Sequence, residues 1–110
     1  MTKDELLRLI DETAADRRTT LDLAGMELDE LPPEIGKLTK LKTLVLGLWD
    51  KKKGIRSNNL KALPDEIGQL TELRSIFLAY NQFKEVPEVI YKFEKLRSPV
   101  LQERLPGILA

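Results

Sequence analysis

The chain has 110 residues, which is enough for one domain, residues 1–110, with a modest hydrophobic core. It carries 18 basic and 18 acidic residues, so no net charge draws it toward nucleic acid or an anionic membrane. It has no cysteine and no histidine, which excludes disulfides, thiolate nucleophiles, sulfur-based zinc sites and the commonest general base. We therefore expect a protein that is not an enzyme and that holds no metal and no cofactor.

The first residues predict a helix that caps the domain. Thr2 and Glu5 have the spacing of a capping box, which marks a helix start. Apolar residues then recur on one helical face: Leu6, Leu7, Ile10 and Ala14. We expect an amphipathic helix over residues 3–15, within an N-terminal cap of residues 1–17. The alternative is a helix that is offered to the groove of a partner.

The same first residues lack the basic start and long apolar run of a signal peptide. No stretch approaches the roughly 20 apolar residues of a membrane-spanning helix. The sequence thus predicts a cytoplasmic protein that does not contact a membrane.

A repeat organises residues 18–97. Units begin at Arg18, Leu41 and Leu73, and the period from Leu73 to the next start at Leu96 is 23 residues. The last unit displays the pattern in full: Leu73, Ile76, Leu78, Asn81, Phe83, Val86, Pro87, Ile90 and Phe93. The middle unit is longer because nine residues, 48–56, are inserted.

Each part of the repeat predicts a structure. Residues 41–46 and 73–78 alternate apolar and other residues, which is typical of short strands with one buried face. Asn58 and Asn81 follow the strands, where a buried amide can both donate and accept hydrogen bonds. The first unit has Met26 in this slot. A Leu-Pro pair and acidic residues come next and predict short helical return legs.

The inserted residues 48–56 contain Trp49, the single tryptophan, and the run Lys51, Lys52 and Lys53. One interpretation is a solvated hairpin or loop, with Trp49 folded back onto the repeats. A second is a protein-binding protrusion, because functional loops are commonly carried on rigid scaffolds. A third, weaker one is nucleic-acid contact through residues 51–56, where four cations lie beside an aromatic residue.

Leu96 begins a fourth unit that fails, because Pro99 stands where a core leucine belongs and proline does not fit a central strand. Residues 98–110 therefore predict either an irregular C-terminal cap or the tail of a fragment whose further repeats are missing. We favour the cap.

The units resemble leucine-rich repeats of the 23-residue type L-x-x-L-x-L-x-x-N-x-L-x-x-L-P-x-x-I-x-x-L. One segment of the chain has the sequence Leu-Pro-Pro-Glu-Ile-Gly-Lys-Leu-Thr-Lys-Leu and is followed by a unit with a long insertion. This combination is similar to the repeat regions of bacterial Roco-type GTPases and related cyanobacterial proteins. The resemblance implies an α/β solenoid. This would be a short right-handed superhelix with a concave parallel sheet, short return helices and an N-terminal capping helix.

The resemblance also implies a scaffold that binds a protein or peptide on its concave face. The alternative is a repeat segment that regulates a larger Roco-type signalling GTPase, and the chain itself contains no G-x-x-x-x-G-K-[ST] phosphate loop. We expect no nucleic acid, membrane or small-molecule substrate as partner. The sequence assigns neither the identity of the partner nor the oligomeric state.

Alternation along each strand predicts the binding residues, because the neighbours of the buried leucines must face outward. We expect an exposed apolar and aromatic patch with a charged rim, and such patches mark partner sites. The patch consists of Val45, Leu48, Trp49, Phe77 and Tyr80, and the rim of Asp22, Lys42 and Arg74. The alternative is that the insertion or the tail folds over this patch.

Overall fold

The structure is a computed structural model, and it describes residues 1–97. Helix α1 (Lys3–Ala15) precedes three parallel strands, β1 (Thr20–Asp22), β2 (Thr43–Asp50) and β4 (Ser75–Leu78). Strand β3 (Gly54–Arg56) pairs with the end of β2. Three short 3-10 helices, η1 (Pro33–Lys37), η2 (Asp65–Gln69) and η3 (Glu88–Lys92), return the chain from one strand to the next.

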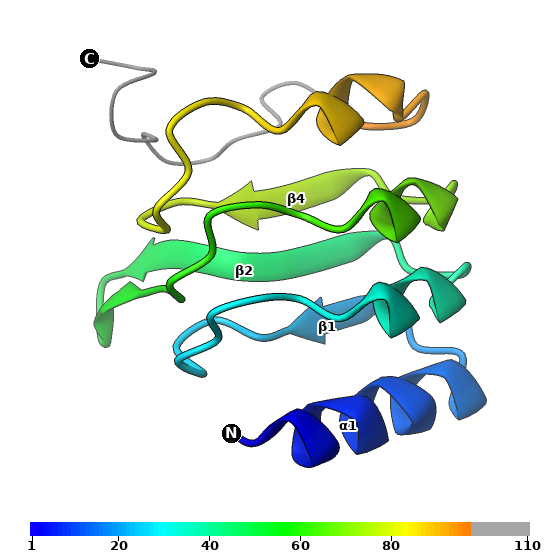
Figure 1. The fold of residues 1–110 in the computed structure, drawn as a ribbon, viewed down its shortest axis with the longest axis horizontal. Coiled ribbons are helices and arrows are strands. Elements are labelled where there is room, and N and C mark those ends of the chain that lie inside the picture. The colour runs from blue at the N-terminus through cyan, green and yellow to red at the C-terminus, as the bar shows by residue number, and fades with distance from the viewer. Residues whose placement is uncertain (98–110) are drawn as a thin grey trace.

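The predicted N-terminal helix is confirmed with its capping box. The Thr2 Oγ1 accepts a hydrogen bond from the Glu5 backbone N–H at 3.1 Å, and the Glu5 side chain accepts one from the Thr2 backbone. Leu6 and Ile10 of α1 are buried against the first coil of the chain. Figure 1 shows α1 lying along the end of the stack next to β1, so the helix closes that end of the core.

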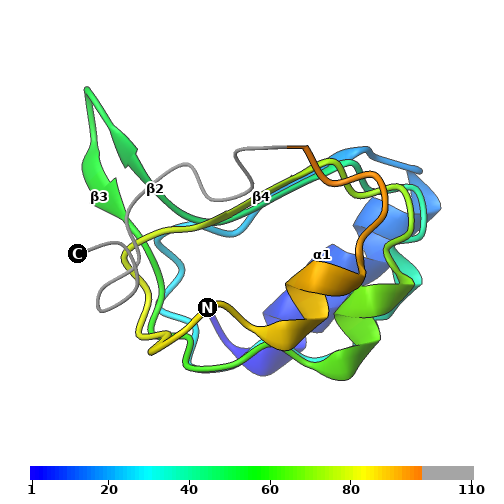
Figure 2. The ribbon, with the colours of Figure 1, turned by 90° about the horizontal axis from the view of Figure 1, so that it is seen from above.

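Each coil of the chain consists of a strand, a turn and a 3-10 helix, and successive coils stack (Figure 1). In the parallel sheet Leu21 is in register with Leu44, and Leu44 with Ile76. Figure 2 looks down the stack: the strands form one wall, the return helices form the other, and the core lies between them. Completely buried leucine and isoleucine side chains from both walls fill it, such as Leu44, Ile35 and Ile67.

Two buried asparagines connect the coils at the ends of the strands. The Asn58 Oδ1 accepts from the backbone N–H groups of Met26 and Leu28, and its Nδ2 donates to the carbonyls of Leu23 and Leu46 at 2.9 Å each. Three of these four partners belong to the preceding coil. The side chain therefore satisfies backbone groups that no strand pairing reaches, as predicted for this slot.

Asn81 repeats this arrangement one coil later. Its Oδ1 accepts from the Leu60 backbone N–H, and its Nδ2 donates to the carbonyls of Leu46 and Leu78. Both asparagines thus bond back to the preceding coil. The first coil has no coil before it, which explains why Met26 replaces the asparagine there without leaving backbone groups of an earlier coil unpaired.

The insertion departs from the predicted strand lengths. Strand β2 does not end at Leu46 but continues to Asp50, and it returns as β3 in an antiparallel hairpin. A shift in the β2–β4 register between Val45 and Gly47 precedes this extension. Glycine is required at position 47, because a Cβ there would collide with the carbonyl of Ala79 in the next coil.

The fourth coil begins within the described residues. The Arg97 backbone N–H donates to the Arg74 carbonyl at 2.9 Å, as Arg74 does to Lys42 and Lys42 to Thr19. Leu96 is half-buried against the core. The cap or tail predicted for residues 98–110, including Pro99, lies outside the described residues.

Candidate binding surface

The outer face of the sheet lies opposite the return helices, and within residues 1–97 no helix covers it (Figure 2). Two rows of side chains cross it in register. Thr20, Thr43 and Ser75 form the first row, and Asp22, Val45 and Phe77 form the second. Parallel strands lie about 4.8 Å apart, so the members of each row are direct neighbours. The predicted residues Asp22, Val45 and Phe77 therefore share one surface.

The expectation that Val45 is exposed is wrong, because only 8% of the residue is accessible. Val45 lies on the central strand, and its neighbours Asp22 and Phe77 flank it on both sides. A side chain on a central strand has cross-strand neighbours on both sides, which reduces its exposure even on an outer face. Phe77 is half-buried and remains the largest accessible apolar side chain of this row.

Leu48 and Trp49 do not belong to a single patch, contrary to the prediction. They are consecutive on β2, and consecutive side chains of a strand point to opposite faces. Leu48 pairs with Arg56, and Trp49 pairs with Ile55. Leu48 is half-buried, whereas half of Trp49 is exposed (50%), so Trp49 is not folded back to full burial.

Tyr80 is half-buried and has a φ of 58°, in the left-handed region that few residues other than glycine adopt. It stands immediately before Asn81, and Gly25 stands immediately before Met26, in the same slot of the first coil. Gly25 also has a positive φ, 74°. The turn thus takes a left-handed residue in the first and third coils, and the third coil uses a tyrosine where glycine would fit without strain.

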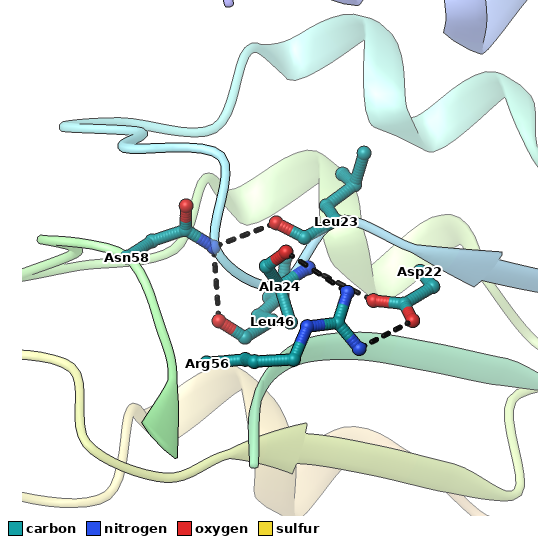
Figure 3. Close-up of polar contacts among 6 residues, drawn as sticks. All are labelled: Asp22, Leu23, Ala24, Leu46, Arg56 and Asn58. Carbon is teal, nitrogen blue, oxygen red and sulfur yellow. Dashed lines mark hydrogen bonds and ion pairs between the residues drawn. The ribbon is translucent and has the colours of Figure 1, made fainter. Parts of the chain in front are cut away.

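The charged rim is only partly available to a partner. Asp22 accepts the backbone N–H of Ala24 through Oδ1 at 2.9 Å, and its Oδ2 lies 3.3 Å from the Nη1 of Arg56. Figure 3 shows Arg56 reaching from the hairpin to Asp22 and to the Ala24 carbonyl. Lys42 and Arg74 lie at the starts of β2 and β4 and are half-buried. Asp22 therefore anchors the base of the β2–β3 hairpin through Arg56.

Two residues of this region are not among those predicted for the patch or its rim, although Arg56 is one of the four cations of the nucleic-acid interpretation. Ile55 and Arg56 have no motif around them, and their positions depend on the pairing of β3 with β2. Arg56 and Asp22 are 34 positions apart in the sequence, so no local sequence pattern predicts their ion pair. The glycine at position 54, with a φ of 75°, is the one local sign of a hairpin turn.

Ion pairs also link coils on the other parts of the surface. The Lys95 Nζ lies 2.7 Å from the Glu72 Oε2, and this hydrogen bond lowers the pKa of the Glu72 carboxyl. The hydrogen bond from the Thr2 backbone likewise lowers the pKa of Glu5. The Lys95–Glu72 ion pair lies at the surface, so it contributes little to stability.

A hollow among the described residues does not coincide with the predicted patch. It has a volume of about 690 Å³ and lies between the turn segments of the second and third coils, where Leu63, Phe83 and Val89 contribute to its wall. Within residues 1–97 no cluster of acidic side chains could hold a metal ion. In the same part of the chain no helix is long and apolar enough to cross a membrane.

Comparisons with known proteins give little beyond this geometry. No protein-family model matches the sequence, and no curated protein matches it. Among solved structures, an LRR protein of Leptospira interrogans is similar, with a TM-score of 0.35 and 22% sequence identity. The similarity covers 78% of this chain, which spans 32% of that chain's length. A TM-score this low does not assign a fold by itself, and the resemblance to Roco-type proteins has no counterpart among these findings.

Proposed function

We propose that this chain is a short leucine-rich repeat solenoid that binds a protein or peptide on the outer face of its sheet. The observation that carries the proposal is the pair of in-register rows across β1, β2 and β4, on a face that no helix of residues 1–97 covers. Adjacent strands hold these side chains in fixed relative positions. A ligand therefore meets a preorganised surface, which reduces the entropy lost on binding.

Phe77 and Tyr80 are the anchors of this surface. Both are aromatic, both are half-buried, and they lie on β4 and in the turn that follows it. Aromatic side chains dominate the binding energy of many protein interfaces. The backbone strain at Tyr80 supports the same assignment, because glycine would relieve the strain but would remove the phenol. Lys42 and Arg74 contribute a basic edge at the starts of the strands.

The other predicted roles have no specific observation in their favour. Regulation of a larger Roco-type GTPase, nucleic-acid contact through residues 51–56 and a cytoplasmic location all stay predictions. The same holds for the expectation that the chain is not an enzyme. Protein binding is the function that the arrangement of side chains on the sheet supports best.

The proposal is tested by quantitative affinity capture followed by titration of each captured partner. The wild-type chain is compared with a Phe77→Ala/Tyr80→Ala variant whose folding is verified by circular dichroism. Truncation of an interface anchor costs about 1 to 3 kcal/mol. Each lost anchor should therefore weaken binding by about fivefold to 150-fold.

A matched control separates loss of the site from loss of any exposed aromatic residue. Tyr91 lies on η3, on the wall opposite the sheet, and 75% of it is exposed. Tyr91→Ala should leave binding unchanged. Undiminished binding by the double variant, or an equal loss in Tyr91→Ala, would refute the sheet face as the site.

A further inference from the structure

The β2–β3 hairpin is a structured arm at the edge of the proposed binding face. Leu48, Trp49 and Asp50 of β2 pair with Arg56, Ile55 and Gly54 of β3. The turn contains three residues, 51–53, and is followed by Gly54 in the left-handed conformation, a common way to close a hairpin with a short loop. Figure 2 shows the arm extending beyond the rest of the sheet.

The base of this arm is fixed to the first coil. The Arg56 Nη1 lies 3.3 Å from the Asp22 Oδ2, its Nη2 donates to the Ala24 carbonyl, and 24% of the Arg56 side chain is exposed (Figure 3). The Gly25 backbone N–H donates to the Ser57 carbonyl at 3.1 Å. These contacts hold the arm in one direction, which makes it a preorganised recognition element.

The anchoring also decides which face of the arm is open. Cross-strand partners share a face, so Leu48 and Arg56 lie toward the first coil. Trp49 and Ile55 occupy the opposite face, and they are 50% and 58% exposed. Four large apolar residues of the described chain are exposed, and two of them are these direct neighbours. The aromatic side chain of Trp49 and the branched aliphatic side chain of Ile55 thus form one exposed apolar pair on the arm.

The tip of the arm, next to this apolar pair, consists of three consecutive exposed lysines, Lys51, Lys52 and Lys53. The whole chain is neutral, so the tip is a local concentration of positive charge. We propose that the arm binds a protein segment in which an apolar side chain stands beside carboxylates. The apolar side chain packs on Trp49 and Ile55, and the carboxylates meet the lysines.

A protein segment fits the arm better than a lipid surface or a nucleic acid. The arm presents one apolar pair directly beside the lysines, which matches one apolar side chain beside carboxylates on a protein segment. A planar membrane would meet only the arm. Three lysines neutralise at most about three phosphates, which supports only weak nucleic-acid binding. The inference rests on the proposed function and specifies the chemistry of the partner.

Trp49 supplies a direct assay, because it is the single tryptophan of the chain. The probe is a short synthetic peptide of alternating glutamate and leucine residues, titrated into the full chain while Trp49 emission is recorded. Docking of a leucine on the apolar pair should shift the Trp49 emission to shorter wavelength, because it removes water from the indole ring. A peptide with glutamine in place of glutamate should bind about tenfold or more weakly, and added salt should weaken the glutamate peptide only.

Variants locate the binding, with fluorescence anisotropy of a labelled peptide as the readout. Trp49→Ala/Ile55→Ala and the triple change Lys51→Gln/Lys52→Gln/Lys53→Gln should each weaken binding by about tenfold or more. The control triple Lys3→Gln/Lys61→Gln/Lys84→Gln alters the net charge equally at other exposed lysines and should leave binding unchanged. Absence of peptide binding, or an equal loss in the control triple, would overturn the proposal.

Two further ligands distinguish the alternatives. Vesicles of phosphatidylcholine and phosphatidylserine and a short DNA duplex replace the peptide; tighter binding of either through the same lysines would assign the arm to that ligand and overturn the proposal. Phe77→Ala separates this inference from the proposed function. If it leaves peptide binding intact while the arm variants abolish it, the peptide binds the arm independently of Phe77, and the capture experiment with the Phe77→Ala/Tyr80→Ala variant decides the sheet face separately.

Discussion

The asparagine at position 58 gives the sharpest test of how the coils are held together. It is 3% exposed and makes four hydrogen bonds, two as acceptor and two as donor, to the backbones of two coils. Asn58→Ala leaves the backbone groups of Leu23, Met26 and Leu28 without this partner, whereas the Leu46 carbonyl keeps the hydrogen bond from Asn81. With a net value of about 1 kcal/mol for each bond, and partial rescue by water, we expect a loss of about 2 to 4 kcal/mol.

Such a loss is a large part of the stability of a small domain, which is typically about 5 to 15 kcal/mol. Urea denaturation followed by circular dichroism measures it as a shift of the midpoint at constant slope. The adjacent Asn59 is exposed, so Asn59→Ala is the matched control and should change stability by less than about 0.5 kcal/mol. A change of similar size in both variants would refute the reasoning.

Asn58→Asp tests the donor half of the side chain separately. A carboxylate accepts from Met26 and Leu28 but faces the carbonyls of Leu23 and Leu46 without a proton to donate. Burial beside carbonyl oxygens would raise the pKa of this carboxyl above its unfolded value. The variant should therefore be most stable below the unfolded pKa of about 4 and should lose stability as the pH rises. Equal stability of the aspartate and asparagine chains at neutral pH would contradict the assigned bonds.

The repeated part of the fold is predictable because the same physical demand recurs at each period. Leu44 and Ile76 are buried at equivalent positions, and the predicted amide slot places Asn58 and Asn81 against backbone groups. Met26 looks like an error in the pattern when the sequence is read alone. The structure gives its reason: the asparagines bond backward along the stack, and the first coil is preceded by α1 instead of another coil.

The candidate site is less predictable because exposure depends on neighbours that are distant in sequence. Val45 is outward on its strand, as alternation indicates, yet it is buried on the central strand, in register with Asp22 on one side and Phe77 on the other. The sequence predicts the arm only as one of several interpretations of the insertion, because three adjacent lysines do not indicate a strand. Its direction follows from the bond between Arg56 and Asp22, which no local pattern specifies.

Two residues in left-handed conformation yield the remaining predictions. Arg17 follows α1 with a φ of 53°, in a position that glycine usually occupies, so Arg17→Gly should raise the free energy of unfolding by about 1 kcal/mol relative to Arg17→Ala in urea denaturation. At Tyr80 the two variants Tyr80→Gly and Tyr80→Ala both remove the phenol, so they differ only in the backbone. Gly25 takes the equivalent conformation in the first coil, with a φ of 74°. Because a Cβ crowds the backbone at positive φ, the glycine variant should be more stable than the alanine variant by about 1 kcal/mol. Both should bind a sheet-face partner equally weakly, since the phenol is the anchor. Equal stability of the two variants would show that the turn imposes no strain at Tyr80, and the argument from strain to binding would then fail.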